Sequence, residues 1–156
     1  MHLKTLKLHN IRSYTDEEIN FPKSSIMLSG DIGSGKSTLL LAIEFAFFGI
    51  MRGELNGDSL LRKGTTDGSV TLSFFVNGAD YEITRGLKKS TRGINQTAGE
   101  LVSDAGREEL TPVELKSRVL DILGYPASLA GKTLLYRYTV YTPQEEMKRV
   151  ILEHKE

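Results

Sequence analysis

The chain of 156 residues is 39% hydrophobic, which is enough for one domain with a buried core. Its 20 lysines and arginines balance 20 aspartates and glutamates, so the overall charge gives no signal for nucleic acid or a membrane surface. The absence of cysteine excludes disulfides and thiolate metal sites and fits a reducing compartment. The longest apolar stretch, 39–48, is too short for a membrane span, and the amino terminus lacks a signal peptide's apolar centre. We therefore expect a cytoplasmic protein without a membrane partner.

Two strands are predicted before the first glycine-rich segment. Leu6 and Leu8 alternate with polar residues, which is typical of a half-buried strand. Residues 10–14 then turn the chain, and Ile19 and Phe21 belong to a second alternating strand. The arrangement differs from that of a simple GTPase, in which the phosphate loop usually follows the first strand.

Residues 30–38, Gly-Asp-Ile-Gly-Ser-Gly-Lys-Ser-Thr, fit the phosphate-loop pattern G-x-x-x-x-G-K-[ST]. The apolar run 25–28 predicts the strand that leads into this loop, and 37–48 have the helical spacing expected after it. Glycines allow the backbone to curl around phosphates, and the helix N-terminus attracts negative charge. Lys36 is expected to contact the β- and γ-phosphates, and the Ser37 hydroxyl to bind Mg²⁺. The alternative is a glycine-rich turn that fits the pattern by chance.

The helix after the loop ends in a cluster of aromatic residues. Phe45, Phe47 and Phe48 are expected to pack in the core rather than to stack on bases, and Gly49 is the expected end of the helix.

The middle of the chain predicts a surface loop and then a hairpin. Residues 53–68 are polar, glycine-rich and without period, as in a loop. Alternation over 70–74 and 81–83, with Asn77-Gly78 between, predicts a β-hairpin with a type I′ turn. Residues 85–93 are basic and predicted to be flexible; they could contact DNA phosphates, although such a run is more often a solvated loop.

The last third predicts a weak strand at 100–103 and two capped helices. Thr111-Pro112-Val113-Glu114 is a capping box, and its helix is expected to end at Gly124. Residues 136–140 alternate as a strand, and Thr142-Pro143-Gln144-Glu145 opens a second capped helix without a stop signal at the last residue. We therefore expect a fragment that ends inside a helix.

Two other classes of site are not supported by the sequence. His2, His9 and His154 are scattered without ligand spacing and are expected at the surface or at strand edges. Hydrolysis of a nucleotide also needs a carboxylate after an apolar strand, but Asp80 follows a hairpin turn and Asp121 lies in a predicted helix. If the protein is an ATPase, a second lobe must complete its site.

Several motifs together resemble the amino-terminal head lobe of the SMC-like ABC ATPases, and most of all the SbcC/Rad-fifty double-strand-break repair ATPases. They are the turn 10–14, the phosphate loop, the sequence Ile83-Thr84-Arg85 after the hairpin, and Tyr141-Thr142-Pro143-Gln144 at the start of a helix. The resemblance covers nearly the whole chain and implies an α/β fold, a P-loop ABC-type lobe with a mixed sheet, an antiparallel hairpin layer and flanking helices. It places the lobe at 1–142 and the start of a coiled-coil helix at 143–156.

The resemblance also implies roles for residues at matching positions. Arg12 matches an arginine that contacts the nucleotide phosphates, with Ser13 beside it, and Gln144 matches the Q-loop glutamine that binds Mg²⁺ and senses the γ-phosphate. With Lys36, Gln144 is the expected catalytic group, and with Ser37 it is an expected metal ligand. The remaining expected nucleotide contacts are Ile32, Gly33, Ser34, Gly35, Thr38, Leu61, Arg62 and Lys63.

The implied cofactors are ATP and Mg²⁺. The implied partners are the protein's own carboxyl-terminal lobe, a second copy in an ATP-dependent homodimer, an Mre-eleven/SbcD-type nuclease and double-stranded DNA ends in the nucleoid. Without the second lobe, weak nucleotide binding and almost no turnover are expected. The alternatives are a chromosome-organising SMC or RecF-like ATPase, a non-catalytic ATP-binding module and, less favoured, a small-substrate kinase.

Overall fold

A computed structural model describes residues 1–50 and 57–125 and places their strands in one sheet. The strand order is β2-β1-β3-β4-β6-β7, with β5 paired to β4. The strands are β1 (His2–Ile11), β2 (Tyr14–Asn20), β3 (Asp67–Val76), β4 (Ala79–Ser90), β5 (Gly93–Gln96), β6 (Gly99–Ser103) and β7 (Gly106–Leu110). The helices are α1 (Lys36–Phe48), α2 (Gly57–Leu60) and α3 (Pro112–Ile122).

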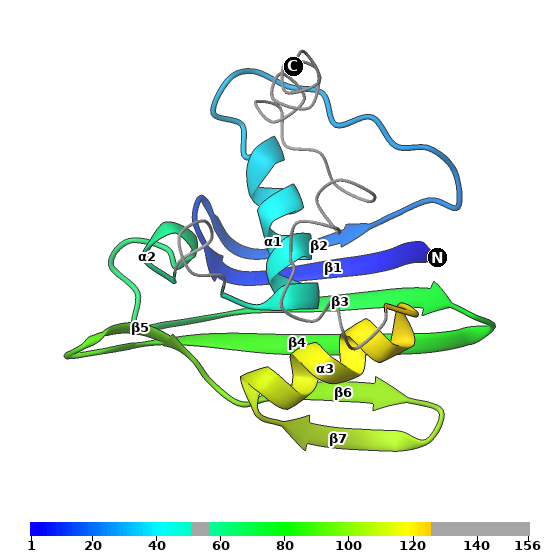
Figure 1. Ribbon diagram of the computed structural model, residues 1–156. Helices are drawn as coiled ribbons and strands as arrows, with labels where there is room; N and C mark the ends of the chain where they lie inside the picture. The colour runs from blue at the N-terminus through cyan, green and yellow to red at the C-terminus, as the bar shows by residue number, and fades with distance from the viewer. Residues whose placement is uncertain (51–56, 126–156) are drawn as a thin grey trace, which may run out of the picture.

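Both longer helices cover the same face of the sheet (Figure 1). α1 crosses β1, β3 and β4, and α3 packs beside it over β6 and β7. The sheet with a hairpin layer and flanking helices confirms the predicted fold class, and all pairings between the described strands are antiparallel. The predicted strand at 136–140 and the helix from residue 143 lie outside the described residues, as does the boundary between the two expected units.

The two faces of the sheet differ in polarity because side chains alternate along each strand. Leu6 and Leu8 of β1 lie opposite Leu72 and Val70 of β3, and all four are buried beneath α1. Phe47 of α1 packs edge-on against Phe74 of β3, with ring centroids 5.1 Å apart. The predicted strand over Leu6 and Leu8 and the core role of the phenylalanines are therefore confirmed.

The β3–β4 hairpin and the capping box also form as predicted. Asn77 and Gly78 both have positive φ, 51° and 84°, as a type I′ turn requires. The Thr111 hydroxyl accepts a hydrogen bond from the Glu114 N–H, and the Glu114 carboxylate accepts from the Thr111 N–H. Hydrogen bonds from the side chain and backbone of Thr111 lower the pKa of Glu114. α3 is therefore fixed at its start by local chemistry, as the sequence predicts.

Residues 25–28 form no strand, contrary to the prediction. No described residue pairs with this segment, and Ile26, Met27 and Leu28 are exposed. A β-strand needs a hydrogen-bonded neighbour, so apolar content alone cannot make one. The segment runs as an extended connection over the top of the molecule to α1 (Figure 1).

Two segments predicted as loops are more ordered than expected. Within 53–68, the described part contains α2, and Leu60 and Leu61 are buried in the core. The predicted flexible run 85–93 is mostly the end of β4, which continues to Ser90 and returns as β5. The prediction failed because the polar residues mask single apolar side chains that pack against the sheet. The weak strand at 100–103 is confirmed as β6.

Candidate nucleotide-binding site

The phosphate loop leaves helix donors available to a ligand. Gly33 and Gly35 have φ values of 86° and 92°, which residues with a Cβ atom rarely adopt. Gly35 is the N-cap of α1, and no side chain caps the first turn. The uncapped N–H groups and the positive end of the helix dipole make this turn suitable for an anion.

Lys36 occupies the centre of the loop in the absence of a ligand. Its Nζ donates to the carbonyl oxygens of Gly30 and Asp31 at 2.5 and 2.7 Å, and to Ser34 Oγ at 3.0 Å. These oxygens solvate the ammonium group where phosphate oxygens would otherwise do so.

Arg12 and the loop lie around one cavity. A pocket of about 630 Å³ is lined by Arg12 and Ser13 from the β1–β2 turn and by residues of the phosphate loop and the first turn of α1. These are Gly30, Ile32, Gly33, Ser34, Gly35, Lys36, Ser37 and Thr38. The expected contacts from two separate parts of the sequence are thus brought together around one pocket.

The three other expected contacts do not line this pocket. The Leu61 side chain is 5% exposed and belongs to the core, so it offers a ligand no side-chain atom. Arg62 donates to the carbonyl oxygens of Arg12 and Ser13, at 3.1 and 2.8 Å. Lys63 is exposed beyond it. Gln144, the expected catalytic and metal-binding amide, lies outside the described residues.

The residues present fit a magnesium ion that is delivered with the nucleotide. Ser37 is exposed and lines the pocket beside Lys36. Mg²⁺ usually takes one or two protein oxygens and completes its shell with phosphate and water. The described residues hold no cluster of three acidic or histidine side chains that could bind a metal alone. The hydroxyl of Ser37 is therefore the group that would hold the ion.

Tyr14 is a pocket-supporting residue that the sequence analysis did not select. A Cβ built on Gly35 would lie 2.6 Å from Tyr14 Oη and 3.0 Å from its Cζ. The phenol ring therefore covers the glycine at the start of α1 and links the β1–β2 turn to the phosphate loop. The signal was visible only as an aromatic residue directly after Arg12 and Ser13.

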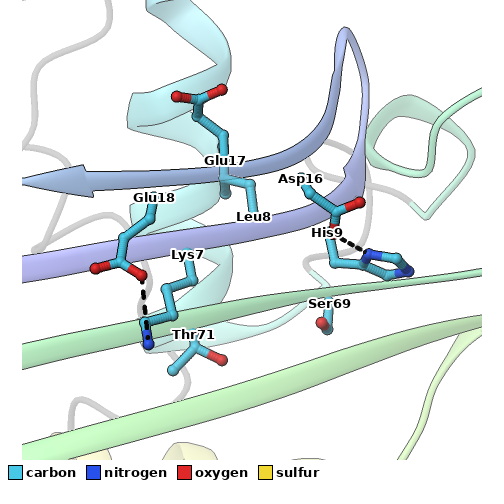
Figure 2. Close-up of a pocket in the computed structure, with 8 residues that line it drawn as sticks. All are labelled: Lys7, Leu8, His9, Asp16, Glu17, Glu18, Ser69 and Thr71. Atoms are coloured by element: carbon cyan, nitrogen blue, oxygen red, sulfur yellow. Dashed lines mark hydrogen bonds and ion pairs between the residues drawn. The ribbon is translucent and has the colours of Figure 1, made fainter.

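A second pocket, on the open face of the sheet, is a poor candidate for a phosphate site (Figure 2). Its polar side chains already pair: His9 Nδ1 lies 2.6 Å from Asp16 Oδ1, and Lys7 Nζ lies 3.5 Å from Glu18 Oε2. The three carboxylates of Asp16, Glu17 and Glu18 would repel a polyphosphate. His9 is half exposed, as predicted for a surface histidine.

Arg85 holds the end of α1 that lies away from the pocket. Its guanidinium donates to the carbonyl oxygens of Ala46 and Phe47 at 2.8 and 3.1 Å, and more weakly to that of Pro112. Burial lowers the pKa of Arg85 to about 10, so the side chain remains charged at neutral pH and complements the helix C-terminus. The expected DNA role of the segment 85–93 therefore cannot include Arg85, which is 2% exposed.

Known proteins resemble this chain in sequence. Residues 5–156 match the family model described as an AAA domain. The chain is 39% identical over 83 residues to the DNA double-strand break repair Rad50 ATPase of Archaeoglobus fulgidus, covering 53% of this chain and 9% of the relative. It is 27% identical over 151 residues to the same-named protein of Methanococcus maripaludis, covering 97% and 14%. The chain thus spans a small part of these relatives.

Two solved structures share the fold. The SMC head domain from Thermotoga maritima superposes with a TM-score of 0.53 at 27% identity, over 76% of this chain and 42% of that one. The recombination mediator protein RecF with ATP superposes with a TM-score of 0.56 at 20% identity, over 70% of this chain and 28% of that one.

No helix in the described ranges is long and apolar enough to cross a membrane. The chain belongs to the AAA domain family and, within it, resembles the Rad50 ATPases in sequence and the SMC head domain in fold.

Proposed function

We propose that the chain binds ATP with Mg²⁺ as one lobe of a DNA double-strand-break repair ATPase. The observation that carries the proposal is the single pocket formed by Arg12, Ser13 and the phosphate loop, with Ser37 at its edge. Lys36 and Arg12 bind the phosphates, Ser37 and Gln144 hold the ion, and Gln144 senses the γ-phosphate. Hydrolysis requires the carboxyl-terminal lobe and a second head.

ATP binding by the chain can be tested directly. Lys36→Ala removes the ammonium group from the loop, and we expect at least about a tenfold loss of ATP affinity because a charge-assisted contact is lost. A ¹H–¹⁵N NMR titration with Mg·ATP measures this loss even when binding is weak. Lys23→Ala, an exposed lysine outside the loop, is the matched control. Unchanged affinity in Lys36→Ala would contradict the proposed site.

In this proposal, nucleotide binding closes two heads and moves the helix that the sequence predicts from residue 143. Closure would control an associated Mre-eleven/SbcD-type nuclease and hold DNA ends, and hydrolysis would reopen the heads. Turnover with the complementary lobe present tests this step. No hydrolysis at saturating ATP and Mg²⁺ would favour a non-catalytic binding module.

The β4–β5 hairpin is the proposed contact for DNA on this lobe. Lys88, Lys89 and Arg92 are exposed, and none forms an ion pair with a described residue. Figure 1 shows the hairpin projecting beyond the sheet, where it is accessible to a duplex. Neutralising the three side chains should lower the salt dependence of DNA binding, with a log–log slope smaller by up to about 3. An unchanged slope would exclude the hairpin.

The fold shared with RecF and the SMC head supports a second candidate, a chromosome-organising or RecF-like ATPase. The sequence of the gene beyond codon 156 separates the two. Heptads around a Cys-x-x-Cys apex would support the repair ATPase, whereas heptads around a globular hinge would support a chromosome-organising protein.

A further inference from the structure

We propose that Arg62 is a positioning residue that sets ATP affinity by fixing the turn that carries Arg12. The proposal rests on the proposed function of Arg12 as a phosphate contact. It assigns Arg62 a task different from direct nucleotide binding, which the resemblance implied for 61–63.

The β1–β2 turn needs external support. Asn10 and Arg12 have φ values of 51° and 49°, so two residues with side chains occupy the left-handed region within three positions. Arg12 and Ser13 are exposed and lie between Ile11 and Tyr14, the last pair of the β1–β2 ladder, so neither is itself paired in it. Such a turn keeps one conformation only when surrounding groups hold it.

Arg62 supplies that support from outside the pocket. A single nitrogen, Nη1, donates to the carbonyl oxygens of both Arg12 and Ser13, at 3.1 and 2.8 Å. The backbone N–H of Arg62 donates to the Asn10 carbonyl at 2.9 Å. Arg62 therefore holds three carbonyl groups of the turn, two of which belong to the residues with positive φ.

Other residues of the same segment, Ser59 and Leu60, hold Arg12 itself. Arg12 donates its backbone N–H to Leu60 O at 2.9 Å and its Nε to Ser59 O at 2.6 Å. With Nε engaged, the guanidinium can offer only its two terminal nitrogens to the pocket that Arg12 lines. The direction of these donors is therefore set by the segment 59–62.

That segment is itself rigid. Leu60 and Leu61 are buried, at 0% and 5% exposed, and Leu61 forms a β-bridge with Ile11. The hydrogen bonds from Arg62 to the β1–β2 turn, which we call the clasp, thus connect the exposed turn to the core. Losing the Arg62 side chain should free the turn while Leu60 and Leu61 stay buried. This separation makes a positioning role measurable apart from folding.

A double-mutant cycle between Arg12 and Arg62 tests the proposal, with Mg·ATP affinity of the full chain measured by NMR titration. We expect Arg62→Ala to weaken ATP binding about five- to tenfold when Arg12 is present, and less than about twofold in an Arg12→Ala background. Equal losses in both backgrounds would show a direct phosphate contact and overturn the proposal. No loss when Arg12 is present would overturn it as well.

Two further variants separate geometry from charge. Arg62→Lys keeps the positive charge but lacks the planar guanidinium group. Its affinity for ATP should therefore be at most about twofold higher than that of Arg62→Ala. Full rescue by lysine would reduce Arg62 to a source of charge and overturn the proposal. Lys63→Ala removes a neighbouring exposed cation and should leave affinity within about twofold.

The outcome also distinguishes this inference from the proposed function. If Lys36→Ala abolishes binding while Arg62→Ala does not, the nucleotide site stands and the clasp fails. If Lys36→Ala leaves binding unchanged, the site itself fails. The amide resonances of Arg12 and Ser13 provide an independent readout, because they should broaden or shift in Arg62→Ala before any nucleotide is added.

Discussion

The two ends of α1 differ in almost every physical respect. The carboxyl end is buried: Phe45, Phe47 and Phe48 are at most 3% exposed, and the charged Arg85 satisfies the last carbonyl groups. The amino end is open: its first turn has no side-chain cap, and the preceding segment exposes Met27 and Ile32. One helix therefore combines a fixed anchor with an unsatisfied end, and only the open end is available to a ligand.

Arg85→Ala should have the largest effect, because it breaks the anchored end. It leaves the buried carbonyl groups of Ala46 and Phe47 without their donors, and we expect a loss of about 3 kcal/mol in the free energy of unfolding. Urea denaturation followed by circular dichroism measures it. Lys88→Ala, exposed on the same strand, should change stability by less than about 0.5 kcal/mol. A loss of unfolding free energy below about 1 kcal/mol for Arg85→Ala would mean that Arg85 does not fix the carboxyl end of α1.

Gly35→Ala should have an intermediate effect at the open end. The new Cβ would need φ near 92° and would meet the Tyr14 phenol, so we expect a loss of about 1–2 kcal/mol in stability and weaker ATP binding. Gly33→Ala is the matched control, because its φ is 86° and nothing lies within 4 Å of its Cβ. If both variants lose the same stability, backbone strain alone explains Gly35 and the Tyr14 contact is unimportant.

Met27→Ser should have the smallest effect. The Met27 side chain is 88% exposed, so its replacement removes little buried apolar area from the described fold. We expect a change of less than about 0.5 kcal/mol in urea denaturation. A loss above about 1 kcal/mol would show that the segment before the phosphate loop is packed in solution, and the contrast between the two ends of α1 would weaken.

Local sequence signals predicted the elements whose stability is local. The phosphate loop, the Asn77-Gly78 turn and the Thr111 capping box depend on glycine conformation and on hydrogen bonds a few residues apart, so the sequence alone identified them. The resemblance added Arg12, which lines the pocket with the loop. The site residues themselves remain predictions until a nucleotide is bound.

Signals between distant segments were not visible in the sequence. Arg85 appeared as part of a basic run, because nothing nearby indicates that the end of α1 packs over β4. Arg62 was expected at the nucleotide from the resemblance, and nothing in the sequence indicated its hydrogen bonds to Arg12 and Ser13, which lie about fifty residues earlier. The run 25–28 was predicted as a strand from its apolar residues, but a strand also depends on a neighbour that composition does not reveal.

Among the described residues, β2 and β7 end the main strand order of the sheet while β5 pairs with β4 alone, and the edges at β2 and β7 affect how copies of the protein meet. An outer strand exposes unpaired backbone groups and can recruit the edge of another molecule. Here β2 carries Asp16, Glu17 and Glu18, and β7 carries Glu108 and Glu109. Glu108 is paired with Arg118, and β7 also carries Arg107, so repulsion between like charges is expected mainly where two copies approach through β2.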